Sequence, residues 1–180
     1  MDSLKGQLLI SGGGLYDPNF RHTVILLAAH DEQGAVGVVL NRPLDVTVED
    51  AVPVLSDLTV PGEALFEGGP VEPGHAVLLV EVDDPGMLDV QVFGSVGFLT
   101  GEVSAELRPR IRRARIYVGH SGWGPGQLEA EMGEDSWILE PAIADDIFTD
   151  DPDSLWRRVL ERKGPDYVAV SRIPFDPSMN

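Results

Sequence analysis

The chain has 180 residues, a length that suits one domain with a single hydrophobic core. Its 43% hydrophobic and 24% charged residues are typical of a globular protein, and no apolar run approaches the roughly 18 residues that a membrane-spanning helix requires. The formal net charge of −17 disfavours direct binding to nucleic acid, and the absence of cysteine excludes disulfides, thiolate nucleophiles and zinc sites built on thiolates.

No internal repeat or long linker divides the chain, so we expect one domain over residues 1–180. The first residues, MDSLKGQLLISGGG, contain no long apolar segment of the kind found in secretory signals. We therefore expect a cytoplasmic protein that does not cross a membrane.

Runs of β-branched and other apolar residues predict that strands dominate the first two-thirds of the chain. Residues 23–29 and 35–40 are separated by DEQG, which is typical of a hairpin turn, and are expected to form two buried central strands. Further strands are predicted at 7–10, 64–67, 75–82, 89–93, 115–118, 136–139 and 167–172.

Two helices are predicted in the C-terminal half. Residues 152–163 carry an apolar stripe, with Asp151 placed to cap the N-terminus and Gly164 placed to end the helix. Residues 127–132 predict a shorter helix. Strands in hairpins followed by helices favour an α+β fold over alternating βαβ units.

The stretch IYVGHSGWGPGQL at 116–128 suggests a catalytic serine, because an apolar strand enters a glycine-rich turn before a helix. The nucleophile elbow requires Gly-x-Ser-x-Gly, whereas Trp123 stands two residues after Ser121. No histidine follows Ser121 in the chain, so a triad would need His30 or His75 to be brought to it by folding. A turn serine bonded to backbone is the favoured interpretation.

The sequence predicts neither a metal nor a cofactor. No His-x-x-x-His pair is present, and the Glu-x-x-His spacing of Glu72 and His75 does not signal a metal site. The glycine clusters at 12–14 and 68–69 match neither a Walker nor a dinucleotide pattern. The glycines at 119–126 precede a helix whose N-terminus can hold an anion, although turn geometry explains them as well.

Five arginines lie between Arg108 and Arg115, against the sign of the overall charge. Such a cluster can bind nucleic acid or a phosphorylated partner. However, no aromatic residue is interleaved for base stacking, and 30 carboxylates are available to neutralise the arginines. A salt-bridged surface is the favoured interpretation.

Three stretches together resemble the signature blocks of the YqgE/AlgH family, and the resemblance covers the chain from about residue 6 to 180. They are DPNFRHTVILLAAHDEQGAVGVVLNRPL at 17–44, FEGGPV at 66–71 and GHSGWGPGQLEAEM at 119–132, followed by a similar ending, FDPSMN. The resemblance implies an α+β fold with a bifurcated mixed β-sheet, partly closed into a small barrel and surrounded by helices. It also implies a role in transcriptional regulation. We expect that role to be indirect, because no helix-turn-helix with a basic recognition helix is evident.

The residues matching the family motifs define a candidate binding pocket. In it Arg42 acts as an anion fork, Trp123 as an apolar wall and Gln127 as a polar contact for a small anionic ligand. Members commonly read GYAGW or GYSGW where this chain reads GHSGW, so a hydroxyl at Ser121 is dispensable and His120 replaces an aromatic residue. The full candidate set is Asn41, Arg42, Gly68, Gly69, Pro70, Ser121, Gly122, Trp123, Gly124, Gln127 and Glu129.

The leading hypothesis is a cytoplasmic, non-enzymatic regulatory or small-ligand-binding protein. One alternative is a hydrolase that uses Ser121 or a water activated by Glu129. The other is a protein–protein adaptor in which Trp123 anchors the partner.

Overall fold

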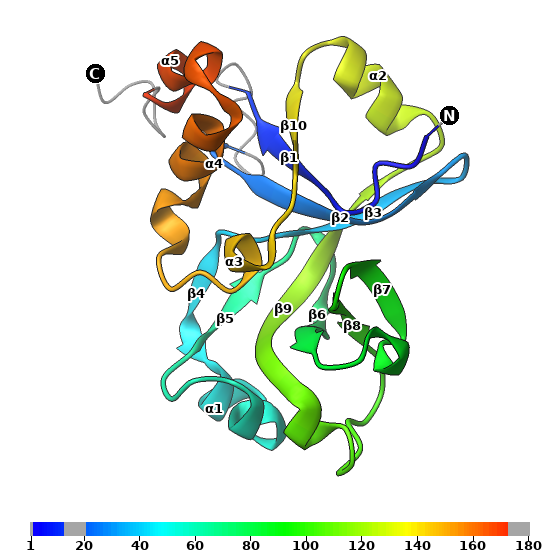
Figure 1. Ribbon diagram of the computed structural model, residues 1–180, viewed down its shortest axis with the longest axis vertical. Coiled ribbons are helices and arrows are strands. Elements are labelled where there is room, and N and C mark those ends of the chain that lie inside the picture. Colours follow the sequence, from blue (N-terminus) through cyan, green and yellow to red (C-terminus); the bar gives the residue numbers. More distant parts are fainter. Residues whose placement is uncertain (1, 13–20, 173–180) are drawn as a thin grey trace.

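The computed structural model describes residues 2–12 and 21–172, and it shows a large branched sheet with helices on several sides (Figure 1). Ten strands hydrogen-bond in the order β10-β1-β2-β3-β9-β6-β8-β7, with β4 and β5 off this path. The strands are β1 (Gln7–Ser11), β2 (Val24–Asp31), β3 (Gly34–Val39), β4 (Pro43–Thr47), β5 (Ala64–Glu67), β6 (Val71–Val82), β7 (Val90–Phe93), β8 (Val96–Leu99), β9 (Ile111–Trp123) and β10 (Trp137–Pro141). Residues 13–14 and 17–20 of the sequence motifs and the ending FDPSMN lie outside the described residues.

The helices are short and concentrate in the C-terminal third. The α-helices are α1 (Val48–Ala51), α2 (Gln127–Gly133), α3 (Ala144–Ile147), α4 (Leu155–Lys163) and α5 (Val168–Ser171). Short 3-10 helices are η1 (Pro53–Leu58), η2 (Pro85–Met87), η3 (Arg108–Arg110), η4 (Pro152–Ser154) and η5 (Pro165–Tyr167). Among the described residues no helix is long and apolar enough to cross a membrane.

The sheet branches at β9, its longest strand. One edge of β9 pairs with β6 along most of its length. The other edge pairs antiparallel with β3 near Ser121 and parallel with β5 at Tyr117 and Val118. The change of neighbour falls at Gly119, whose φ of 75° is one that glycine adopts readily. β9 therefore belongs to both halves of the sheet. The first half contains β10, β1, β2 and β3, and the second contains β4, β5, β6, β7 and β8. The two halves diverge from β9 (Figure 1).

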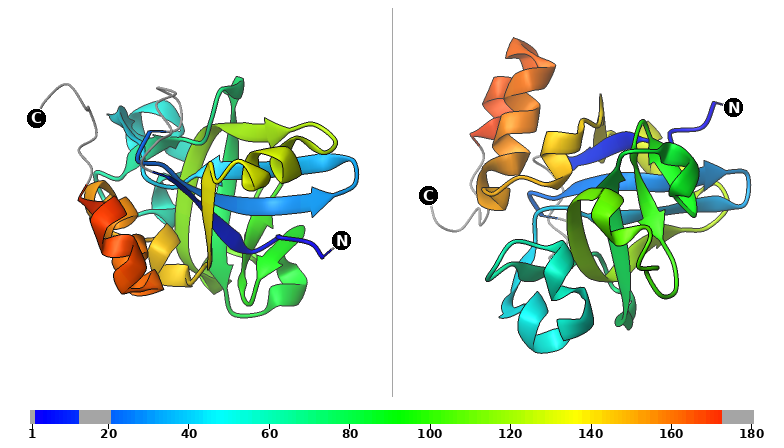
Figure 2. Two further views of the ribbon diagram at one scale, coloured as in Figure 1. Left: turned by 90° about the horizontal axis from the view of Figure 1, so that it is seen from above. Right: turned by 60° about the horizontal axis from the view of Figure 1, so that its bottom comes forward.

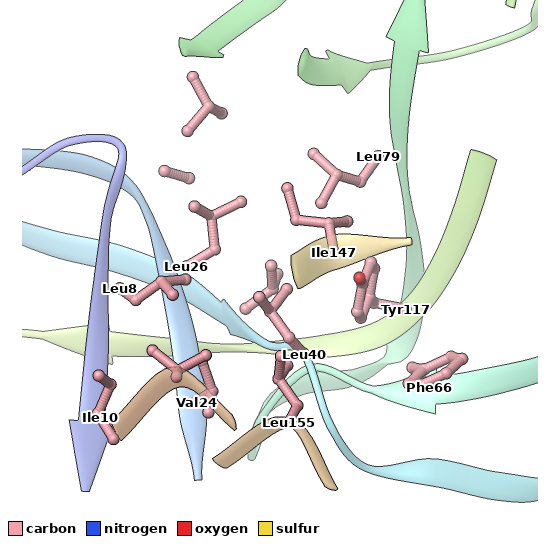
Figure 3. Close-up of a cluster of buried hydrophobic side chains, with 14 of the residues drawn as sticks. Leu8, Ile10, Val24, Leu26, Leu40, Phe66, Leu79, Tyr117, Ile147 and Leu155 are labelled. Carbon is pink, nitrogen blue, oxygen red and sulfur yellow. The ribbon is translucent and has the colours of Figure 1, made fainter. Parts of the chain in front are cut away.

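The two halves face each other across the main core. Side chains from β1, β2 and β3 meet side chains from β5, β6, β8 and β9, and α4 closes one end of this cluster (Figure 3). The outer face of the first half packs under α2, and the outer face of the second half packs under α1 and η1. Figure 2 shows α4 and α5 on the side away from the tip of the β2–β3 hairpin. The main core is therefore bordered by α4 on one side and lies toward the tip of the β2–β3 hairpin on the other.

The α+β class is confirmed, but the expected closure into a small barrel is wrong. The hydrogen-bonded path ends at β10 on one side and at β7 on the other, and these two strands do not pair. The two halves are held together by apolar packing between their faces instead of by a closing ladder. The two halves diverge from β9, and the end strands β10 and β7 lie apart (Figure 1).

The predicted hairpin and most predicted strands are confirmed, as are the helices at 127–132 and 152–163. The strand predicted at 167–172 is wrong, because Tyr167 and Val170 pack on the core with the i, i+3 spacing of a helical turn. The expected cap at Asp151 is also wrong, since its carboxylate accepts a hydrogen bond from the Ser154 hydroxyl instead of from a backbone N–H.

Candidate functional site

Ser121 is a buried structural residue. Its side chain is fully buried in β9, and its hydroxyl donates a hydrogen bond to the carbonyl oxygen of Gly68 at 3.2 Å. A Cβ atom on Gly69 would collide with the carbonyl group of His120. The backbone at Gly68 and Gly69 therefore crosses the backbone of β9 at Gly119 and His120 in direct contact. A nucleophile must reach its substrate, and this hydroxyl is enclosed where it fastens the crossing. The structure therefore favours the turn-serine interpretation over hydrolysis by Ser121.

Trp123 is a buried side chain whose indole belongs to a hydrogen-bond network under α2. Only 6% of Trp123 is exposed. Its indole N–H and that of Trp137 both donate to one carboxylate oxygen of Glu131, at 3.3 and 3.0 Å. The amide of Gln127 donates to the other oxygen of Glu131 and accepts from the N–H of Gly124. The Gly-Trp-Gly motif thus builds a folded corner, and Trp123 is not exposed as an anchor for a partner.

Glu129 links α2 to β2. Its carboxylate lies 2.6 Å from Nε2 of His30, whose Nδ1 accepts a hydrogen bond from the backbone N–H of Leu4. This pattern assigns the imidazole proton to Nε2, which donates to Glu129. The hydrogen bond from His30 lowers the pKa of the Glu129 carboxyl from its usual value. Glu129 therefore holds α2 and the N-terminal segment against β2.

Replacing Glu129 with glutamine is expected to lower the melting temperature at neutral pH but not in acid. The folded-state pKa of Glu129 is depressed, so its stabilisation is present above the ordinary value of 4.5 and is lost as the pH falls through the folded-state pKa. Thermal unfolding of the wild type and Glu129→Gln between pH 7 and pH 3 tests this. A gap that stays constant over this range contradicts it, and exposed Glu134→Gln is the matched control.

The side chains of Asn41 and Arg42 hydrogen-bond to residues 21–24, at the start of β2 and just before it. The amide of Asn41 donates to the carbonyl oxygen of His22 and accepts from the N–H of Val24. Arg42 donates to a backbone carbonyl and to a hydroxyl within residues 21–24, at 3.0 and 2.8 Å. Both motif residues therefore have a structural task in the fold.

These two residues also line a basic pocket of about 430 Å³ beside α4. Within it the ring of His22 stacks on Trp156, with centroids 3.8 Å apart. Its lining consists of Arg21, His22, Asn41, Arg42, Asp153, Trp156, Arg157 and Ser171. Trp123 pairs with Ala35 near the start of β3, whereas Arg42 follows the end of that strand. The structure therefore places Arg42 and Trp123 in different parts of the molecule.

The arginine cluster at 108–115 is neutralised by the protein's own carboxylates, as predicted. Four of its five arginines form ion pairs within the described residues. The pairs are Arg108–Asp57 at 2.6 Å, Arg112–Asp83 at 2.7 Å, Arg113–Glu81 at 2.9 Å and Arg115–Glu63 at 2.7 Å. Within the same residues, no group of three or more His, Asp or Glu side chains is placed to hold a metal ion.

A second, apolar cavity of about 490 Å³ lies where the β2–β3 hairpin meets β6, β7, β8 and β9. It was not predicted from the sequence. Its lining is Ala28, Ala29, Val36, Val38, Leu55, Ala76, Val77, Leu78, Val90, Phe98, Leu99, Thr100, Gly101, Ile116 and His120. Thr100 and His120 are the two polar side chains in this set, and His120 comes from the GHSG motif. The local signals were small residues and that histidine, which form no recognisable motif.

The fold and these sites define a small α+β protein with a branched, mainly antiparallel sheet, an apolar cavity and a basic pocket. The AlgH-like family model matches residues 8–168, and the chain belongs to this family, as its motifs predicted.

The similarity extends over nearly the whole chain. A UPF0301 protein of Streptomyces coelicolor is 39% identical over 189 residues, covering 100% of this chain and 97% of its own. A UPF0301 protein of Chlorobaculum tepidum is 34% identical, covering 97% and 95%. The crystal structure of a Corynebacterium diphtheriae protein superposes with a TM-score of 0.86 at 25% identity, covering 92% of this chain and 90% of that one. The solution structure of AlgH from Pseudomonas aeruginosa gives 0.67 at 28% identity, covering 94% and 93%.

Proposed function

We propose that this protein is a non-enzymatic small-ligand-binding protein whose ligand occupies the apolar cavity. The observation that carries the proposal is the lining, which is aliphatic, aromatic or glycine except at Thr100 and His120. Ligand pockets commonly have volumes of roughly 300–1,000 Å³ and combine an apolar wall with a few polar groups. The cavity of about 490 Å³ fits that description.

Small side chains keep the cavity open. The register between β2 and β3 shifts between Leu27 and Ala29, so Ala28 is an extra residue in a β-bulge. The bulge turns two adjacent alanines, Ala28 and Ala29, to the cavity, where larger side chains would fill it. Its rim is accessible, since Val36 is 41% and Val90 is 40% exposed. A ligand therefore has both space and a route of entry.

The glycine motifs position the polar end of this cavity. Val36 pairs with Gly122 across β3 and β9, and residues two apart on a strand face the same side. His120 therefore lies on the same face as Gly122 and the cavity wall at Val36 and Val38. The crossing of Gly68 and Gly69 over His120, fastened by Ser121, fixes the backbone that carries the imidazole. Gly68, Gly69 and Ser121 thus act by positioning His120.

Ligand binding in this cavity suits an indirect regulatory role in the cytoplasm. The cavity borders both halves of the sheet, so an occupant contacts β2–β3 and β6–β9 at once. A ligand that binds only this arrangement shifts the conformational equilibrium toward it. We propose that a protein partner recognises the ligand-bound conformation and that this protein itself does not contact DNA.

Ala29→Trp is expected to abolish binding of the neutral fluorescent probe N-phenyl-1-naphthylamine, which the wild type should bind. Ala29 is exposed at the rim, so an indole there fills the cavity without displacing the core. The measurement is a fluorescence titration, with unfolding curves recorded for every variant. Exposed Ala130→Trp on α2 is the matched control and should bind as the wild type does. Equal probe affinity in a folded Ala29→Trp variant would remove the cavity as the site.

A small anion in the basic pocket is a second candidate, favoured by the three guanidinium groups of Arg21, Arg42 and Arg157 in its lining. Arg157 is the informative residue, because it is exposed and its ion pair with Glu161 is long at 3.9 Å. We expect pyrophosphate to raise the melting temperature of the wild type but not of Arg157→Ala. An equal shift in both proteins, or none in either, counts against this candidate.

A further inference from the structure

We infer that the apolar cavity selects ligands that are uncharged or cationic and whose polar group donates a hydrogen bond, and that it excludes anions. This inference rests on the proposed function, since it specifies the ligand of the same cavity. It differs from the anionic ligand expected from the sequence motifs, which predict that Arg42 and Trp123 share one pocket.

Thr100 presents an acceptor to the cavity. Its hydroxyl donates to the Asp89 carboxylate at 3.2 Å, and its backbone N–H donates to the same oxygen at 2.7 Å. A hydroxyl has one proton, so once that proton is committed its oxygen can only accept from a ligand. The carboxylate behind it adds negative charge at this end. An alcohol, amine or ammonium group satisfies this arrangement, whereas a carboxylate or sulfonate meets an oxygen lone pair.

Two further carboxylates, Glu72 and Glu102, lie close in the chain to residues of the lining. Val71 pairs with His120 across β6 and β9, and the next residue is the exposed carboxylate Glu72. Glu72 lies 3.0 Å from the imidazole of His75. The hydrogen bond with His75, with a smaller contribution from nearby His120, lowers the pKa of Glu72 from its usual value, so Glu72 is ionised at neutral pH. Glu102 follows Gly101 of the lining and is exposed.

Within the residues that the structure describes, no lysine or arginine lines the cavity to balance these carboxylates, and His120 is the one ionisable side chain in the lining. The nearest arginines along the chain lie on β9, where Arg113 and Arg115 pair with Glu81 and Glu63. An ion moved from water into an apolar site requires a partner of opposite charge, and the net charge of −17 opposes an anion at longer range. Both the nearby carboxylates and the net charge of the protein therefore disfavour binding of a ligand with an anionic group.

Matched competitors with one aromatic body test the inference. We expect 1-naphthylmethylamine and 1-naphthalenemethanol to displace bound N-phenyl-1-naphthylamine at concentrations at least tenfold lower than 1-naphthoate. The variant Glu72→Gln/Asp89→Asn removes two carboxylates without changing the size of the side chains. It should lower the ratio of the displacing concentration of naphthoate to that of the amine at least threefold. The exposed control Glu134→Gln, whose side chain lines neither pocket, should leave the ratio unchanged.

The outcomes separate the inference from the proposed function. Absence of probe binding in the wild type, or binding that Ala29→Trp does not affect, overturns the proposed function and the inference with it. Probe binding that Ala29→Trp abolishes, together with displacement by naphthoate as effective as by the amine, overturns the inference alone. An unchanged ratio in the folded Glu72→Gln/Asp89→Asn variant likewise overturns the assigned role of the carboxylates.

Discussion

Arg115→Met is expected to lower the free energy of unfolding by about 3–5 kcal/mol, because it leaves a buried carboxylate without its cation. The side chains of Arg115 and Glu63 are only 7% and 8% exposed, and their closest atoms lie 2.7 Å apart. The guanidinium also donates to the carbonyl oxygens of Ile147 and Thr149, each at 2.8 Å, and lies over the ring of Phe66. Its removal therefore leaves several buried acceptors unsatisfied. Urea denaturation measures the loss.

Arg112→Met is the matched control for Arg115→Met. It removes an arginine from the same strand, but the pair with Asp83 is 65% and 42% exposed, so we expect a change within about 0.5 kcal/mol. Arg115→Met combined with Glu63→Leu should recover part of the loss, since a buried unpaired charge is worse than an apolar pair. A loss below about 1 kcal/mol in Arg115→Met would show that water reaches Glu63.

The central strands could be predicted because their signal is local. Residues 24–31 and 34–39 are mostly apolar and separated by a turn, a local pattern that is typical of a hairpin. The full length of β9 could not be predicted in this way. Its first half is rich in arginine, which favours a surface cluster, yet it pairs with β6 as a strand, and Glu63, Glu81 and Asp83 neutralise the arginines. Those partners are brought by other elements, and no local pattern reveals them.

The motif residues were found from the sequence, but their tasks depend on long-range contacts. Trp123 and Gln127 stand among glycines, as ligand-binding residues often do, whereas the structure engages both with Glu131. Glu129 is engaged by His30, which lies 99 residues away in the chain. The apolar cavity went unpredicted because its lining comes from six strands and two connecting segments, each of which looks like ordinary core. Small residues become informative only when the structure shows that they face one space.

Gly69→Ala is expected to prevent folding or to destabilise the protein by roughly 4 kcal/mol or more. A Cβ atom at this position would collide with the backbone carbonyl group of His120, which a side-chain movement cannot relieve. The backbone also has φ +147°, a conformation that residues with a side chain rarely adopt. Circular dichroism with urea denaturation measures the effect. Any folded fraction should also bind N-phenyl-1-naphthylamine poorly, because a displaced His120 disturbs the polar end of the cavity.

Gly74→Ala isolates the crossing from the general effect of replacing a glycine. Gly74 lies in the irregular stretch of β6 between Val71 and Ala76, only five residues from Gly69. An added Cβ there has nothing within 4 Å, and the backbone is not in the positive-φ region. We expect a change within about 1 kcal/mol, in either direction, and unchanged probe binding. If Gly69→Ala were as stable as Gly74→Ala, the backbone at Gly69 would not be held tightly against His120. That result would contradict the proposal that this contact positions His120 at the cavity.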